Sequence, residues 1–278
     1  MQLRNYVASL VLALIAIAAS WAAAQSPLVE LLQRHGIQIR DGAFDVAFDA
    51  HATPAVPVTP GSFATPLAVL TAAEGKERIA GAYAFGLLAG PSGRGASPQE
   101  LAAAGQSLLL MIASEDRSVR IAGARVAGRM FAVPFDRSNA PPVVPAGMTV
   151  ALFALLNQER DIDQLAAMDA LGLMRETTAV GSLTERYAYY RDGGKRALAG
   201  GALEALARIG DRSTLTIVQQ LAGDRWAEGK DATGLAVAFA RERLLKDGSI
   251  AVIRLAADDK SRRNQARGYL AELGAAVP

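Results

Sequence analysis

Apolar residues recur every three to five positions over most of this chain, which is the spacing of an amphipathic helix. In the segment 197–210, for example, Leu198, Leu203 and Leu206 follow one another at steps of five and three residues. Proline, which interrupts helices, is absent from 146–277. The pattern therefore predicts a succession of helices through this part of the chain.

The helical pattern also repeats. Five segments share the same rhythm of small and apolar residues: 77–88, 119–130, 162–174, 197–210 and 264–274. Gly86, Gly128 and Gly172 occupy the same position in the first three of them, at steps of 42 and 44 residues. A sixth segment, 235–245, lies in the gap before the last, in a less clear register. Self-similarity of this kind indicates a stack of like units.

Each repeated segment is followed by a turn and a second apolar segment. The turns within 207–224 and 243–259 carry Gly-Asp or Asp-Gly followed by Ser. The second segment after 119–130 is predicted at 146–157, beyond a long loop at 132–145. The unit is therefore predicted to be a pair of helices.

These units resemble HEAT repeats, including the shorter HEAT-like repeats of the phycobilisome-lyase type. The resemblance is carried by the A-x-x-A-L-x-x-[IM]-G rhythm, the G-D-x-S break and the second apolar segment, and it extends over 67–278. It implies an all-α fold, an α-solenoid of about five to six HEAT-like helix pairs in a right-handed superhelix. It also implies that the second helices line the concave face.

Alanine accounts for 57 of the 278 residues. Alanine is the best helix former, and small side chains let neighbouring helices approach closely. Ala80, Ala122 and Ala166 recur at one position of the repeat. The alanine content therefore favours closely stacked helix pairs.

The segment 25–66 precedes the repeats and differs from them. Ser26 and Pro27 open a short apolar stretch that ends at Gly36, which predicts a short capped helix with Pro at its first position. Apolar and polar residues then alternate over 42–51, which predicts an extended or irregular segment. Residues 52–66 are rich in Pro, Thr and Ala, and we interpret them as a linker.

Residues 1–24 have the pattern of a secretory signal peptide. Arg4 is followed by an apolar stretch and by Ala22-Ala23-Ala24 before Gln25, which is a small-residue cleavage pattern. Cleavage predicts an exported protein, periplasmic or secreted. The alternative is an uncleaved N-terminal helix that tethers the protein to a membrane, because 6–24 is long enough to span a bilayer.

Charge and cysteine content exclude several function classes. The chain has no Cys, which excludes disulfides, thiol nucleophiles and Cys-ligated metals. Its net charge of +2 becomes +1 once Arg4 is removed, leaving 28 basic and 27 acidic residues. Binding to nucleic acid requires a clustered excess of Lys and Arg, so nucleic acid is not expected as a partner.

No catalytic signature is present in the sequence, and no cofactor is expected. The chain lacks G-x-S-x-G, H-E-x-x-H and P-loop patterns. If 42–51 is extended, Asp45, Asp49 and His51 share one face, which gives a metal- or ligand-binding or enzymatic module beside the repeats as an alternative function. An ordinary solvated face explains the same three residues more simply.

The sequence therefore favours an exported, non-catalytic protein-interaction scaffold whose partner is another protein. Arginine and tyrosine are enriched at the centres of protein interfaces. On the second helices, which the resemblance assigns to the concave face, the candidate binding residues are Arg186, Tyr189, Gln220 and Arg254.

Overall fold

The computed structural model describes residues 27–35, 37, 58–59, 61–93, 95–133, 142–220 and 232–277. Within these ranges the regular structure is helical throughout, without any strand. The predicted all-α class is therefore confirmed. The signal segment 1–24 and the alternating segment 42–51 lie outside the described residues.

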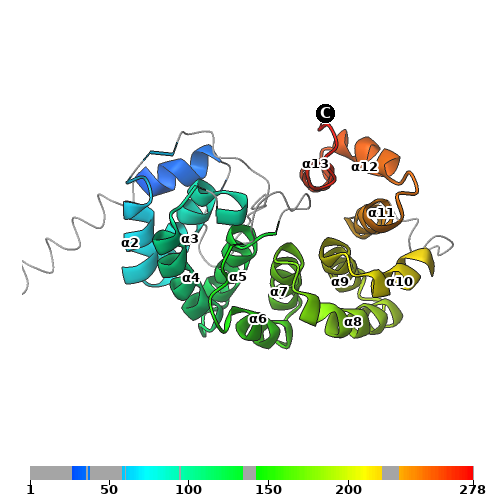
Figure 1. The fold of residues 1–278 in the computed structure, drawn as a ribbon, viewed down its shortest axis with the longest axis horizontal. Coiled ribbons are helices and arrows are strands. Elements are labelled where there is room, and N and C mark those ends of the chain that lie inside the picture. Colours follow the sequence, from blue (N-terminus) through cyan, green and yellow to red (C-terminus); the bar gives the residue numbers. More distant parts are fainter. Residues whose placement is uncertain are drawn as a thin grey trace, which may run out of the picture.

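The helices form two rows along an open arc (Figure 1). The inner row consists of α3 (Gly75–Ala89), α5 (Arg117–Met130), α7 (Asp161–Leu173), α9 (Arg196–Ile209), α11 (Ala232–Leu245) and α13 (Arg263–Glu272). The outer row consists of α2 (Ala64–Ala72), α4 (Pro98–Ile112), α6 (Met148–Leu156), α8 (Val180–Asp192), α10 (Leu215–Gln220) and α12 (Ile250–Ala257). Every segment that the sequence predicts as a first or second helix overlaps one of these helices.

Inner helices stack through small residues at matched positions. A Cβ atom on Gly128 of α5 would lie 2.7 Å from the Cα atom of Ala170 on α7. A Cβ atom on Gly172 of α7 would lie 2.8 Å from the Cα atom of Ala205 on α9. Real Cβ atoms do not approach so closely, so glycine is what permits these backbone contacts. The prediction that small residues serve close stacking is confirmed at these two positions.

Outer helices bury one face only. On α8, Leu183, Tyr187 and Tyr190 are buried against the core, whereas Tyr189 points to solvent. Each outer helix packs mainly on the inner helix that follows it, as α8 does on α9. The sequence predicts that each first helix pairs with the second helix after it. This prediction is wrong, because the most extensive contacts join each outer helix to the inner helix that follows it. After α8 a short turn, 193–195, folds this outer helix back on the next inner helix, α9.

Aspartate side chains close the turns that the sequence marks as breaks. Asp211 accepts hydrogen bonds from the backbone N–H and the hydroxyl of Ser213, at 2.8 and 2.6 Å. Asp247 accepts from the same two groups of Ser249 before α12. Such local hydrogen bonds favour turns over helix continuation. The G-D-x-S pattern is therefore a helix stop followed by a helix start.

The N-terminal part adds one more helix to the array. Residues 27–34 are helical, as predicted, and Leu28, Leu32 and Ile37 are buried in the common core. α2 begins at Ala64, three residues before the predicted start of the repeats at 67. No helix in the described ranges has the length and apolar character needed to cross a bilayer.

Candidate functional site

The four sequence-predicted binding residues lie on the outer row instead of lining the concave side. Arg186 and Tyr189 are on α8, Gln220 is the last residue of α10, and Arg254 is on α12. They are spread over three outer helices and do not form one cluster. The inner side is built by the first segments of the repeat, because their small residues allow burial between neighbours on both sides.

Arg186 is committed to the fold. Its guanidinium donates to the hydroxyl of Tyr190, at 2.9 Å, and to the side-chain oxygen of Asn157. The Tyr190 hydroxyl donates in turn to the side-chain oxygen of Gln164 on α7. This network ties α8 to α7 and to the end of α6. The bonds of the Arg186 side chain therefore serve the fold, and we do not assign it to the binding surface.

The other three predicted residues are accessible. The Tyr189 side chain is 71% exposed, and its ring meets the edge of Tyr190 at a centroid distance of 5.5 Å. Gln220 and Arg254 are also exposed.

The alternative metal residues Asp45, Asp49 and His51 lie outside the described residues. Among the residues that are described, no group of three His, Cys, Asp or Glu is placed to hold a metal ion.

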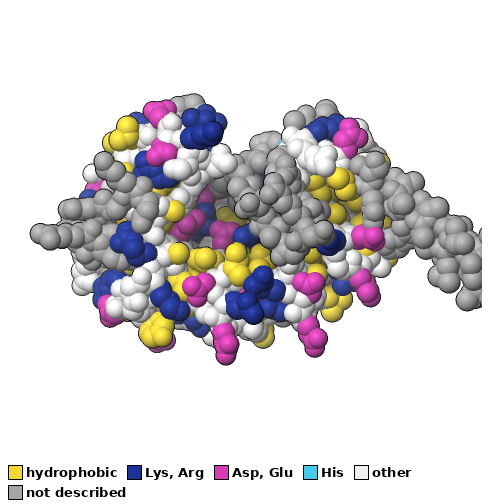
Figure 2. All heavy atoms as spheres, turned by 180° about the vertical axis from the view of Figure 1, so that it is seen from behind, with side chains coloured by type: hydrophobic (Ala, Val, Ile, Leu, Met, Phe, Trp, Pro, Cys, Tyr) yellow, Lys and Arg dark blue, Asp and Glu magenta, His cyan; other side chains and the backbone are white. Residues whose placement is uncertain are grey.

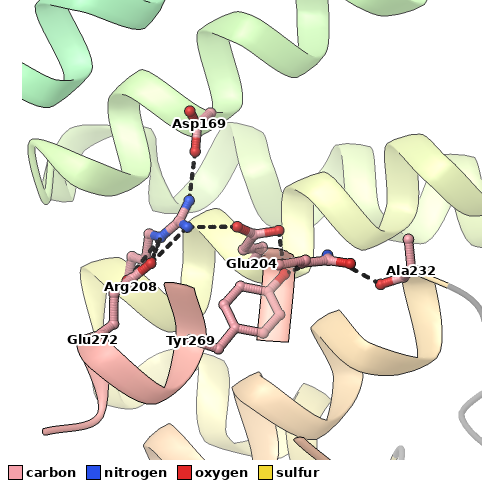
Figure 3. Close-up of polar contacts among 7 residues, drawn as sticks. Asp169, Glu204, Arg208, Ala232, Tyr269 and Glu272 are labelled. Carbon is pink, nitrogen blue, oxygen red and sulfur yellow. Dashed lines mark hydrogen bonds and ion pairs between the residues drawn. The ribbon is translucent and has the colours of Figure 1, made fainter. Parts of the chain in front are cut away.

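A dense group of ion-paired side chains surrounds Arg208, which lies on the inner row near the end of α9 (Figure 3). Arg208 Nη1 lies 2.6 Å from a carboxylate oxygen of Asp169 on α7, and Nη2 lies 2.6 Å from Glu204. Glu272 on α13 accepts from Arg208 Nη2 at 2.8 Å and from Nε at 3.0 Å. One guanidinium thus joins three carboxylates from three inner helices.

Tyr269 extends this Arg208 cluster on α13. Its hydroxyl donates to Glu204 at 2.6 Å and accepts from the Gln265 side chain at 2.9 Å. The Tyr269 ring stacks on Phe239 of α11, with centroids 4.3 Å apart. Polar and aromatic contacts therefore connect α13 to both α9 and α11. In Figure 2 the surface is hollowed on this inner side of the arc, and both acidic and basic side chains are visible there.

Burial and the neighbouring charges shift the pKa values of Glu204 and Arg208. Burial raises the pKa of the Glu204 carboxyl; Arg208 opposes this, and the charges of Asp169 and Glu272 reinforce it. Burial also acts to lower the pKa of Arg208, but Glu204, Glu272 and Asp169 outweigh it and raise that pKa well above its ordinary range. The guanidinium therefore remains charged, and the Glu204 carboxyl takes up a proton more readily than an ordinary glutamate does.

The raised pKa of Glu204 predicts a gain of stability in mild acid. The folded state holds the proton more tightly than the unfolded state, so its advantage grows as pH falls from neutrality toward the ordinary pKa of 4.5. In Glu204→Gln this contribution is absent. Urea unfolding of both proteins between pH 7.5 and 5 measures it: the stability of wild type relative to the variant should rise as pH falls. Parallel pH profiles would contradict the assignment.

A further buried ion pair joins α5 to α7. Arg120 on α5 lies 3.4 Å from the carboxylate of Asp163 at the start of α7, and the Asp163 side chain is fully buried. Arg120 also donates to the carbonyl oxygens of Ser114 and Glu115, at 3.1 and 2.7 Å. Buried ion pairs thus cross-link the inner row here as well as around Arg208.

Sequence reasoning passed over the Arg208 cluster. Two signals were available: Glu204 and Arg208 are four residues apart in an otherwise apolar helix, and Asp169 and Glu204 occupy one repeat position, 35 residues apart. Comparisons with known proteins add nothing further. No family model, no curated protein and no solved structure matches this chain.

Proposed function

We propose that this chain is an exported, non-catalytic scaffold that holds another protein on the outer face of an α-solenoid. The proposed solenoid consists of HEAT-like helix pairs, each formed by an outer helix and the inner helix after it. Two features support it: the inner helices meet through Gly128 and Gly172 at matched repeat positions, and successive inner helices contact one another from α3 to α11.

The observation that carries the binding function is the exposure of large apolar side chains along the outer row. Leu110 on α4 is 66% exposed and Val150 on α6 is 72% exposed, and these two helices contact each other. After Glu100, neither α4 nor α6 contains a charged residue. Large exposed apolar side chains on two neighbouring helices favour a protein interface. We call the exposed surface around Leu110 and Val150 the α4–α6 face.

Affinity capture with matched variants tests this proposal. Leu110→Ser combined with Val150→Ser should remove the co-purifying protein, because it replaces the apolar side chains of the α4–α6 face. Glu159→Gln changes an exposed polar residue in the turn after α6, outside the α4–α6 face, and should leave capture unchanged. If the double variant and the control capture the same protein equally, the α4–α6 face is not the binding surface.

Outer helices beyond α6 offer additional contacts for the same partner. Tyr189 on α8 and Leu255 on α12 are exposed to a similar degree, and Arg254 lies beside Leu255. Tyrosine and arginine are enriched at interface centres. In this proposal Tyr189 and Arg254 keep the binding role that the sequence suggests, on the convex side of the arc.

Export of the protein is part of the proposal, and the mass of the purified protein tests it. If the predicted signal is cleaved, intact mass spectrometry of the protein recovered from the exported fraction should give a chain that begins at Gln25. A mass that includes residues 1–24, together with recovery in the membrane fraction, would replace export by membrane tethering.

A further inference from the structure

The C-terminal pair α12–α13 is attached to the inner row differently from the units before it. Gly128 and Gly172 bring the backbones of successive inner helices together in the middle of the array. α13 contacts α11 less extensively than these inner helices contact one another. Between α11 and α13 the stacked rings of Phe239 and Tyr269 fill the space instead. The last pair is therefore held by side chains more than by close backbone packing.

The Arg208 cluster supplies a further attachment of this pair, beside the packing of α12 on α11 and the bond from the Gln265 side chain to the carbonyl oxygen of Ala232. Glu272 and Tyr269, both on α13, reach Arg208 and Glu204 on α9, which are 64 and 65 residues away in the chain. These bonds bypass α11 and join the last inner helix to the helix two places before it. Glu272 is 8% exposed, so its bond to Arg208 is a buried, charge-assisted one. Such bonds are strong and depend on both partners.

A short connection lies between α11 and α12. It contains two residues in the left-handed region of backbone conformation, Lys246 with φ of 53° and Gly248 with φ of 87°. This region is unfavourable for a lysine. Asp247 between them accepts from Arg241 at 2.7 Å and from the hydroxyl of Ser249. Hinges in proteins are typically a few element-terminal residues of this kind.

We propose that α12 and α13 form a C-terminal arm that turns about residues 246–249 and that the Arg208 cluster holds closed against α9. Loss of the bond between Arg208 and Glu272 releases the arm, while α3 to α11 keep their arrangement. The arm forms one end of the arc, so its release widens the hollow on the inner side (Figure 1). The cluster is thus a conformational device that sets the shape of that side.

Spin-label distances test the proposal directly, because the chain has no native cysteine. Glu185→Cys on α8 and Asn264→Cys on α13 place two labels at exposed positions. The otherwise unchanged protein should give one narrow distance distribution. Adding Glu272→Gln or Arg208→Met should broaden it and shift it, with the helical circular dichroism retained. Amide exchange should accelerate in 250–277, by about a hundredfold for Arg208→Met.

Arg120→Met is the matched control. It removes the buried ion pair with Asp163 between α5 and α7, two helices that also meet through Gly128 and Ala170. The labels on α8 and α13 should keep their distance in this variant. The conservative Glu272→Gln change guards against a general loss of folding in Arg208→Met. An unchanged distance and unchanged exchange of 250–277 in Glu272→Gln would overturn the proposal, as would an equal response to Arg120→Met.

Discussion

Gly172→Val is expected to destabilise the protein by about 3 kcal/mol or more. The new Cβ atom would lie 2.8 Å from the Cα atom of Ala205 and 3.4 Å from its carbonyl oxygen. These are backbone atoms in the middle of α9, so they cannot turn away as a flexible side chain would. The two inner helices must separate, and the core between them loses its packing. Urea unfolding followed by circular dichroism measures the change.

Gly181→Ala is the control for this prediction. Gly181 is also a helical glycine, but nothing lies within 4 Å of a Cβ atom at this position on α8. Alanine there should stabilise the protein by about 0.5 kcal/mol, because alanine favours helix more than glycine does. Opposite signs for the two substitutions are therefore expected. Equal, small effects would show that the inner helices do not meet at Gly172.

Arg208→Met is expected to cost about 3 to 5 kcal/mol, since removing one partner of a buried ion pair leaves the others uncompensated. Here the substitution leaves Asp169, Glu204 and Glu272 close together without their shared cation. Methionine fills part of the space, so the loss reflects charge more than volume. The unfolding free energy at pH 7.5 measures it, and part of the loss should be recovered when Glu204→Gln is added.

The matched control removes an exposed ion pair. Arg34 lies 2.8 Å from Glu30 in the 27–34 helix, and both side chains are more than half exposed. Solvent screens such pairs, so Arg34→Met should change stability by less than about 0.5 kcal/mol. If the Arg208 and Arg34 variants lose similar amounts, the Arg208 cluster does not hold the inner row together.

The helices themselves could be predicted from the sequence. Their apolar spacing and their Asp-x-Ser breaks are local signals, and the structure places a helix in each predicted segment. The matched glycines were also informative. Gly128 and Gly172 recur at one repeat position, and both allow a close backbone approach to the next inner helix. Such features can be predicted because they recur at the same position of successive units.

The arrangement of the two rows could not be predicted from these patterns. Which helix of a pair faces inward depends on how each outer helix folds back on its neighbour. The apolar spacing is the same whether a helix pairs with the one before it or with the one after it, so the spacing does not reveal the arrangement. The candidate residues Tyr189 and Arg254 therefore lie on the outer side. Arg186 was expected on the binding surface, but one of its bonds goes to Asn157, which lies in a turn 29 residues away.

The Arg208 cluster shows the same limit over a longer range. Glu204 and Arg208 are a local pair, but Glu272 comes from a unit 64 residues further on. Only the curvature of the array brings it back to α9. A repeat pattern predicts contacts between neighbouring units, and this contact bypasses one.

Photo-crosslinking from the outer row tests most directly whether the chain is a scaffold that binds a protein there. A photoreactive amino acid placed at Leu110 or Val150 in the exported protein should give a covalent product with one partner protein. The same group at Glu159, an exposed residue in the turn between α6 and α7, should not. Absence of a product from Leu110 and Val150, or an equal product from Glu159, would contradict a partner-binding α4–α6 face.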